Sequence, residues 1–275
     1  MMKKIISWSL CLTVGAMMTV SCRQDIEEAG QDLVEEQQIG RKDVDYSVYA
    51  ADPRAHACRI VTIDGKRSTE PRGAAYTETL WNAGQTVTVS FIGGSNFVRQ
   101  KVIEYAKKWE EHANITFQFV QNNGMIRVSF VQGAGSYSYF GTDALQIASN
   151  TETMNFGWFN DNTPDAEFSR TVLHEFGHAL GLIHEHQHPD VTLDWDRDFV
   201  YAYYAGAPNY WSTADIDYNI LNTINPAYLT YNQYDINSIM HYQILGRMIN
   251  SSTDTPINTV LSEGDKQIAG ILYPF

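Results

Sequence analysis

The sequence has few cysteines, few basic residues and no long apolar run, and each shortage excludes a class of protein. Three cysteines in 275 residues cannot crosslink a chain of this size, which excludes a disulfide scaffold. The 19 basic residues are outnumbered by 32 acidic ones, and a net charge of −13 repels phosphate, so we expect no nucleic-acid partner. The longest apolar stretch, residues 5–20, is interrupted by serine and threonine and is too short for a membrane span.

The first 22 residues have the layout of a secretory signal. Lys3 and Lys4 precede an apolar stretch over residues 5–18, and Ser21 and Cys22 follow it. A small residue before a cysteine resembles a bacterial lipobox, in which the cysteine is lipidated and becomes the first mature residue. We therefore predict an exported protein anchored to a bacterial membrane through lipid on Cys22, and otherwise secreted. An ordinary signal peptide, with Cys22 incidental, is the alternative.

The rest of the chain divides into a tether and a globular domain. Residues 23–75 begin with a polar, acid-rich stretch and are predicted to be an acidic tether with a candidate pro-segment, whereas residues 76–275 have the texture of a folded domain. Thr163 and Pro164 indicate a helix start, because a capping hydroxyl and a proline at the first helical position favour one. Residue periodicity predicts strands over 87–91, 115–119, 126–130 and 154–157, and helices over 98–113 and from 163 onward. This order favours an α+β fold whose second half is long and irregular.

The second predicted helix carries a metal-binding pattern. His174 and His178 are four residues apart, so both imidazoles project from one helix face and can hold a single cation. Glu175 lies about 100° around the helix, where its carboxylate can reach a water beside the metal without being a ligand. Gly181 permits a positive φ that ends the helix, and the resulting turn can bring His184 to the same ion.

This ligand set predicts a catalytic zinc site. Three neutral histidines leave the fourth position of a tetrahedral zinc open for water, whereas structural zinc sites are closed by four protein ligands. A histidine-rich surface helix is the alternative, but it does not explain why core-type residues surround the histidines. These residues are Val172, Leu173, Phe176, Ala179, Leu180 and Ile183.

The extended histidine pattern, followed by a methionine-containing turn, is the signature of the metzincin peptidases. The string Ser-Ile-Met-His-Tyr at 238–242 and the glutamate after the third histidine, Glu185, resemble the astacin-like members of this clan. Further matches are the runs 135–141 and 272–274. The resemblance covers about residues 76–275. It implies a zinc endopeptidase for protein or peptide substrates, with one zinc per chain. The implied fold has an upper twisted mixed sheet with two long helices and a lower irregular lobe. We expect the protein to be a monomer.

The resemblance also assigns roles to matching residues. The three histidines would bind zinc, and Glu175 would be the general base that later protonates the leaving amine. Met240 would form an apolar floor beneath the metal, and Tyr242 would stabilise the oxyanion. Glu185 would pair with an amino terminus freed by processing. Three further histidines are expected to be structural or solvated: His186, His188 and His241.

The chain also departs from the family pattern. Animal astacin-like domains usually carry paired disulfides, whereas Cys58 is the last cysteine here, so stability must come from packing. Residues 186–189 lack the arginine common after Glu185, and the Phe-x-Gly-Asp motif of family proenzymes is absent. A thiolate is a strong zinc ligand, so Cys58 is a candidate latency ligand that would occupy the open position until the chain is cut near Arg72. The alternative for Cys58 is a small apolar residue in a strand, and Asp64 is a weaker latency candidate.

Two other functions compete with the peptidase interpretation. A surface-anchored binding protein with a dead peptidase fold would have lost a ligand or Glu175, and all are present. A zinc hydrolase of cell-wall amide bonds is compatible with the same residues. Cleavage of casein-type substrates compared with release of cell-wall fragments would separate it from a peptidase.

Overall fold

The computed structural model describes residues 59–60, 75, 77–207, 209–223 and 230–275. The predictions for the signal segment and tether, including Cys22, Cys58, Asp64 and Arg72, lie outside these residues. Among the described helices, none combines the length and apolar character needed to cross a bilayer. The account that follows concerns the globular domain.

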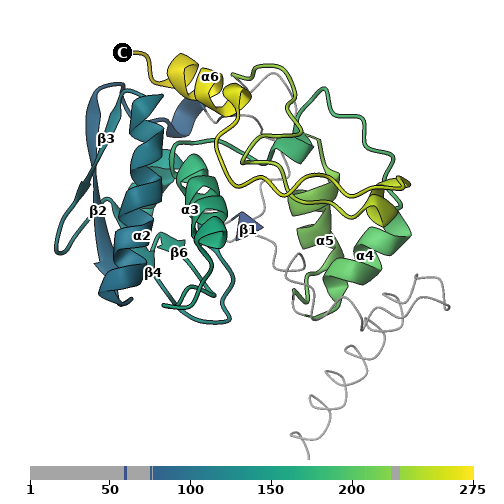
Figure 1. Cartoon of the computed structure of the whole chain (residues 1–275), viewed down its shortest axis with the longest axis horizontal. Helices are drawn as coiled ribbons and strands as arrows, with labels where there is room; N and C mark the ends of the chain where they lie inside the picture. The colour runs from purple at the N-terminus through teal and green to yellow at the C-terminus, as the bar shows by residue number, and fades with distance from the viewer. Residues whose placement is uncertain (1–58, 61–74, 76, 208, 224–229) are drawn as a thin grey trace, which may run out of the picture. The chain divides into compact units, whose positions relative to one another are not determined.

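A six-stranded mixed sheet forms one side of the domain (Figure 1). Its strand order is β1-β5-β6-β4-β2-β3, and β2 pairs in parallel with both β3 and β4. The strands are β1 (Arg59–Ile60), β2 (Gln85–Ile92), β3 (Ile115–Phe119), β4 (Ile126–Ser129), β5 (Tyr137–Ser138) and β6 (Met154–Asn155). The four predicted strands are confirmed as β2, β3, β4 and β6. The sequence did not indicate β5, because two residues are too few to display an alternating pattern. The strand β1 begins directly after Cys58, where the alternative interpretation of that residue places a strand.

The strand β5 runs antiparallel to β6 and in parallel with β1. The approach to β5 is fixed by the buried side chain of Asn155. Its Oδ1 accepts hydrogen bonds from Ser129 Oγ (2.7 Å) and Val131 N (2.8 Å), and its Nδ2 donates to Val131 O (3.2 Å) and Gly135 O (2.6 Å). All four hydrogen-bonding positions of the amide are thus used to shape the loop before β5.

Two helices pack together against the sheet: α2 (Asn96–Ala106) and α3 (Asp165–Ala179). Ser95 caps α2 by accepting a hydrogen bond from Val98 N (3.2 Å). The predicted single helix over 98–113 is wrong at its end, because residues Lys107–Glu111 form a 3₁₀ helix. This tighter turn accompanies the burial of Trp109, whose indole N–H donates to Leu173 O (3.0 Å) in α3.

The predicted capping role of Thr163 is also wrong. The helix α3 begins at Asp165, with Pro164 in the capping position and no side-chain cap. Thr163 instead accepts a hydrogen bond from Asn160 N (2.9 Å), so its hydroxyl is used in the preceding turn. The first turn of α3 carries two acidic residues, Asp165 and Glu167, which suit the positive end of the helix dipole.

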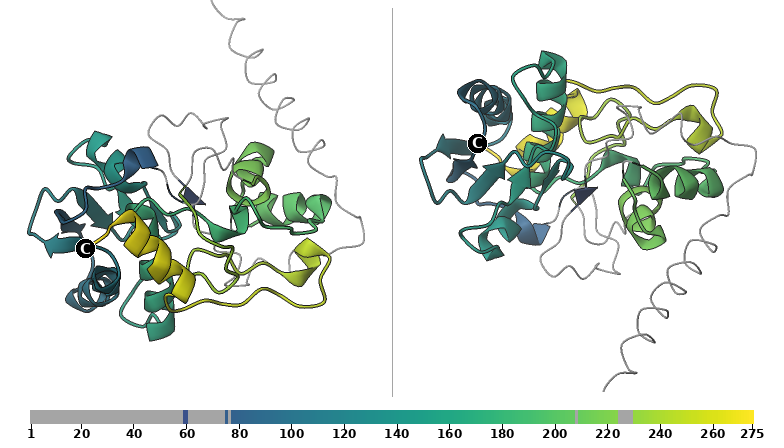
Figure 2. Two further views of the ribbon diagram at one scale, coloured as in Figure 1. Left: turned by 90° about the horizontal axis from the view of Figure 1, so that it is seen from above. Right: turned by 90° about the horizontal axis from the view of Figure 1, so that it is seen from below.

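The second half of the domain is largely irregular, as expected, and contains short helices. They are α4 (Arg197–Ala205), α5 (Thr213–Ile216), a π-helix (Asp217–Leu221) and α6 (Glu263–Leu272), with 3₁₀ turns at Glu185–Gln187 and Gly246–Ile249. An aromatic core joins α4 to α5. Figures 1 and 2 show that α6 lies nearer to α3 and the sheet than to α4 and α5. Tyr273, directly after α6, is fully buried and donates to Leu180 O (2.7 Å) at the end of α3.

Candidate active site

The end of α3 turns the chain as predicted. Gly181 has a φ of 89°, and two hydrogen bonds close the turn, from Gly181 N to His178 O (2.8 Å) and from Leu182 N to Gly177 O (2.9 Å). This pair of bonds is the Schellman arrangement, which needs a residue with positive φ and so favours glycine. The turn carries the chain back to His184.

The structure brings His174, His178 and His184 together. One ring nitrogen from each lies within 4.8 Å of the others, and all three side chains are buried. The Nε2 atoms of His178 and His184 are 3.2 Å apart. Two nitrogens bound to a tetrahedral zinc at about 2.0 to 2.1 Å lie about 3.3 to 3.4 Å from each other, so the cluster has the size of a zinc site.

The other ring nitrogens orient two of these histidines. His174 Nδ1 lies 2.9 Å from Ile239 O, and His178 Nδ1 lies 2.7 Å from Leu182 O. A carbonyl oxygen only accepts, so each Nδ1 carries the proton and each Nε2 has a free lone pair for a metal. Within the described part of the chain, His174 Nε2 has no hydrogen-bond partner, which is the state expected of a metal-facing atom.

Burial also keeps the histidines neutral, as metal binding requires. Burial, followed by repulsion from neighbouring histidines, holds the pKa values of His174 and His184 well below the usual range. Burial lowers the pKa of His178 to about 4, although its hydrogen bond to Leu182 opposes the change. Near pH 7 no proton therefore competes for the lone pairs.

Glu175 and Tyr242 lie beside this cluster. Glu175 follows His174 in α3 and is fully buried. The ring of Tyr242 has its centroid 4.2 Å from that of His184 and 5.8 Å from that of His174. Phe140, two residues after β5, contacts His178 edge-on with centroids 5.2 Å apart, so the end of β5 also borders the site.

The turn around Met240, here called the Met-turn (residues 238–242), packs directly beneath α3. A Cβ atom at Gly177 would lie only 2.4 Å from Met240 Sδ, so the sulfur touches the helix between the two helical histidines. A hydrogen bond from Glu185 N to Met240 O (3.0 Å) joins the Met-turn to the segment that carries His184. Met240 thus packs against α3 beside the histidines, and its role as an apolar floor beneath the metal stays a prediction.

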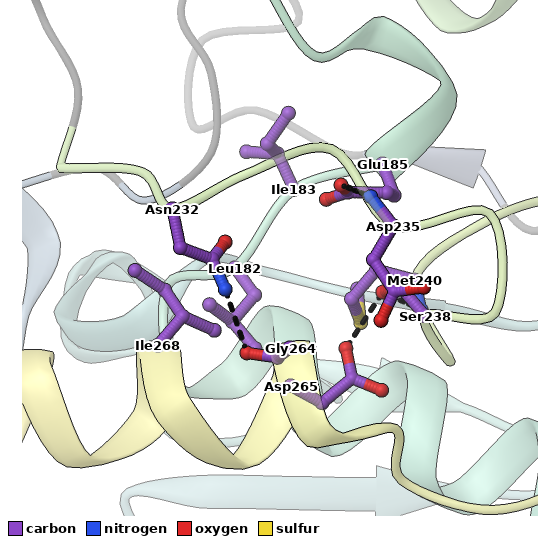
Figure 3. A pocket seen from close by; sticks show the side chains of 10 residues that line it. All are labelled: Leu182, Ile183, Glu185, Asn232, Asp235, Ser238, Met240, Gly264, Asp265 and Ile268. Carbon is purple, nitrogen blue, oxygen red and sulfur yellow. Dashed lines mark hydrogen bonds between the residues drawn. The ribbon is translucent and has the colours of Figure 1, made fainter.

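The carboxylate of Glu185 points toward a small cavity between the Met-turn and α6 (Figure 3). The cavity measures about 20 Å³, and its lining includes Glu185, Asp235, Asp265 and Leu182. Glu185 Oε1 accepts a hydrogen bond from Asp235 N (2.8 Å). Burial raises the pKa of Glu185 to about 8 despite this bond. Such a volume admits one water molecule or a group of similar size.

The remaining histidines of the region bond to backbone carbonyls, in agreement with the predicted structural role. His186 Nε2 lies 3.1 Å from Asn219 O, His188 Nε2 lies 3.0 Å from Asn232 O, and His241 Nδ1 lies 2.6 Å from Tyr242 O.

Sequence reasoning missed Gln187, whose Nε2 donates to carbonyls at both ends of the π-helix, Tyr218 O (2.7 Å) and Asn222 O (3.0 Å). His188 and Gln187 thus provide the contacts after Glu185 in a segment that lacks the family's arginine.

Comparison with known proteins agrees with this fold and site. The sequence profile of the astacin family of peptidases matches residues 73–270. A mixed sheet, a long helix with two histidines and a third histidine after the turn define a zinc metalloendopeptidase that uses one zinc ion. The chain belongs to the astacin family.

Individual relatives share part of this chain. It is 26% identical over 185 residues to zinc metalloproteinase nas-38 of Caenorhabditis elegans, covering 65% of this chain and 22% of that protein. It is 27% identical over 237 residues to Tolloid-like protein 1 of Mus musculus, covering 76% and 20% respectively. The chain thus spans about a fifth of the length of these relatives.

Two solved structures of myroilysin are more similar. One shares 54% sequence identity, with a TM-score of 0.72 over 74% of this chain and 99% of that chain. The other shares 47% identity, with a TM-score of 0.62 over 86% of this chain and 99% of that chain. The structural similarity therefore covers 99% of each myroilysin chain.

Proposed function

We propose that this protein is an exported, lipid-anchored zinc endopeptidase with Glu175 as general base and Tyr242 as oxyanion donor. The observation that carries the proposal is the buried cluster of three neutral histidines, with Glu175 adjacent to His174 in the same helix and Tyr242 packed on His184. The domain over residues 76–275 performs the chemistry, and residues 1–22 and 23–75 act as signal and tether.

In this mechanism the chain's own residues move the protons. Zinc, when bound by the three histidines, lowers the pKa of water and polarises the peptide carbonyl. Glu175 accepts the proton of the attacking water and then transfers it to the leaving amine, so one carboxylate serves as base and then as acid. The hydroxyl of Tyr242 donates a hydrogen bond to the carbonyl oxygen as negative charge develops on it.

Cleavage profiling on a peptide library tests this proposal. We expect cleavage at internal peptide bonds that stops when a chelator removes zinc and returns when zinc is restored. The assay is run separately on membranes and on the medium, and the anchor at Cys22 predicts membrane-bound activity. Cell-wall fragments released without peptide cleavage would favour the amidase alternative, and an intact library would favour the binding protein.

We further propose that the protein is made as a latent precursor in which the Cys58 thiolate ligates zinc. Two observations support this proposal. The three histidines, Glu175 and Tyr242 are all buried, as expected of a site that is covered in a precursor. Arg59, the residue directly after Cys58, pairs with Tyr137 of β5, and β5 leads to Phe140 at the rim of the histidine cluster.

We propose that the precursor is processed near Arg72. Ala75 forms an antiparallel bridge with Leu182, and Leu182 lines the cavity that contains the carboxylate of Glu185. Cleavage after Arg72 would create an amino terminus two residues before Ala75. Its ammonium group could then neutralise Glu185, whose burial without a cation is unfavourable.

The variant Cys58→Ser tests this latency. We expect the unprocessed variant to cleave a fluorogenic peptide while the unprocessed wild type stays silent, because a hydroxyl is a much weaker zinc ligand than a thiolate. X-ray absorption of the wild-type precursor should detect sulfur bound to zinc. A silent Cys58→Ser precursor, with no sulfur on the metal in wild type, would instead leave Cys58 as an apolar strand residue.

A further inference from the structure

The helix α6 begins beside the Met-turn, and its first turn is closed by a capping box. Ser262 Oγ accepts a hydrogen bond from Asp265 N (3.0 Å), and Asp265 Oδ2 accepts one from Ser262 N (2.8 Å). This reciprocal pair satisfies backbone groups at the helix start. Asp265 is nevertheless only 3% exposed, which is unusual for a capping carboxylate on a helix start.

The burial of Asp265 is explained by two hydrogen bonds that leave the helix. Asp265 Oδ1 accepts from Ser238 Oγ (2.6 Å), and Oδ2 accepts from Ile239 N (2.8 Å). Figure 3 shows the Asp265 side chain rising from α6 toward Ser238 on the Met-turn. A single carboxylate thus joins the start of α6 to the first two residues of the Met-turn.

A continuous series of hydrogen bonds leads from this carboxylate to a zinc ligand. Ser238 Oγ donates to Asp265 and accepts from Met240 N (3.0 Å). The N–H of Met240 belongs to the same peptide group as the carbonyl of Ile239, which accepts from His174 Nδ1 (2.9 Å). Each donation strengthens the next acceptor, so the carboxylate charge makes the Ile239 carbonyl a better partner for His174.

The other helical ligand is oriented without this network. His178 Nδ1 bonds to Leu182 O within the turn that ends its own helix. His174 therefore depends on the Met-turn for its orientation, whereas His178 does not.

We propose that Asp265 is a positioning residue for the zinc site, acting through Ser238 and the Ile239–Met240 peptide on His174. It fixes the ring orientation and raises the basicity of that ligand. The proposal rests on zinc binding by the three histidines. Removing an outer partner of a metal-bound histidine typically costs about 10- to 100-fold in metal affinity.

The test measures zinc affinity by competition with a chromogenic chelator in wild type, Asp265→Ala and Ser262→Ala. We expect Asp265→Ala to bind zinc about 10- to 100-fold more weakly. Ser262→Ala removes the capping hydroxyl but leaves the bonds from Ser238 and Ile239 to Asp265. It should lower the melting temperature and leave zinc affinity within about twofold of wild type, because the Asp265 network is intact.

Absorption of the cobalt-substituted proteins provides a readout that a purely structural role would not change. The visible bands should shift in Asp265→Ala and stay unchanged in Ser262→Ala, because only the first variant alters the partner of His174. Zinc affinity and cobalt bands equal to wild type in folded Asp265→Ala would overturn the proposal. So would equal losses of zinc affinity in the two variants, since these would point to helix stability alone.

Asp265→Asn keeps the proposal testable if Asp265→Ala does not fold. The amide oxygen can still accept from Ile239 N, but the amide nitrogen facing Ser238 Oγ donates instead of accepting, which reverses that link. We expect weaker zinc binding than wild type with a shifted cobalt spectrum, and unchanged values would overturn the proposal. Both readouts are independent of peptide cleavage, so they hold even if the proposed peptidase activity fails.

Discussion

Glu175→Gln should retain about one zinc per chain and lose about 10³- to 10⁴-fold in kcat. Glutamine has nearly the shape of glutamate, so it fits the same fully buried position in α3 and leaves the three histidines in place. Its amide cannot accept the proton of the attacking water or deliver one to the leaving amine. Metal analysis and steady-state kinetics on one peptide measure the two effects on the same preparation.

Tyr242→Phe is the matched comparison for this variant. It also keeps the ring that packs against His184. It removes a single oxyanion donor while proton transfer by Glu175 continues, so we expect a smaller loss of about 10- to 10³-fold in kcat. Equal losses in the two variants would contradict the separate roles of base and oxyanion donor.

His184→Ala should lose both zinc and peptidase activity. His184 is the ligand supplied from outside α3, and its Nε2 lies 3.2 Å from that of His178. Without it, two helical histidines remain, which is one ligand fewer than catalytic zinc sites use. Metal content after dialysis against zinc-free buffer should fall far below one ion per chain.

His188→Ala is the control for this loss, because His188 lies four residues further along and bonds to Asn232 O (3.0 Å). The His188→Ala variant should retain its zinc. Stoichiometric zinc and full activity in His184→Ala would show that this histidine is not a ligand.

The elements with a long periodic pattern could be predicted from the sequence. In β3 and in the middle of β2 the buried positions follow the period of a strand, which the sequence displays. All four residues of β4 are buried, and so are residues 171–179 of α3, so the structure buries these two elements on more than one face. The short strand β5 has no such signal, because its position is set by the Asn155 side chain, which reaches Gly135 across 20 residues. The predicted cap at Thr163 failed for a different reason, because its hydroxyl accepts a hydrogen bond from the nearby Asn160 N instead.

The histidine cluster could be predicted because its geometry is local. Four residues on a helix and one glycine turn determine where His174, His178 and His184 lie. The network behind His174 could not be predicted in this way. The spacing of Ser262 and Asp265 does indicate a helix cap, but nothing in it indicates that the same carboxylate binds Ser238, 27 residues earlier. Such contacts depend on how the second half of the domain folds back.

The return of α6 to the first half also determines when the site can be completed during synthesis. A ribosome makes α3 and its histidines long before α6, and 93 residues separate Leu180 from its partner Tyr273. Until residue 265 has been made the Met-turn lacks Asp265, and until residue 273 has been made the end of α3 lacks the hydroxyl of Tyr273. A nascent chain therefore contains the histidine motif without its supporting contacts. The supported form of the site therefore requires α6 to have been made and folded back onto α3 and the Met-turn.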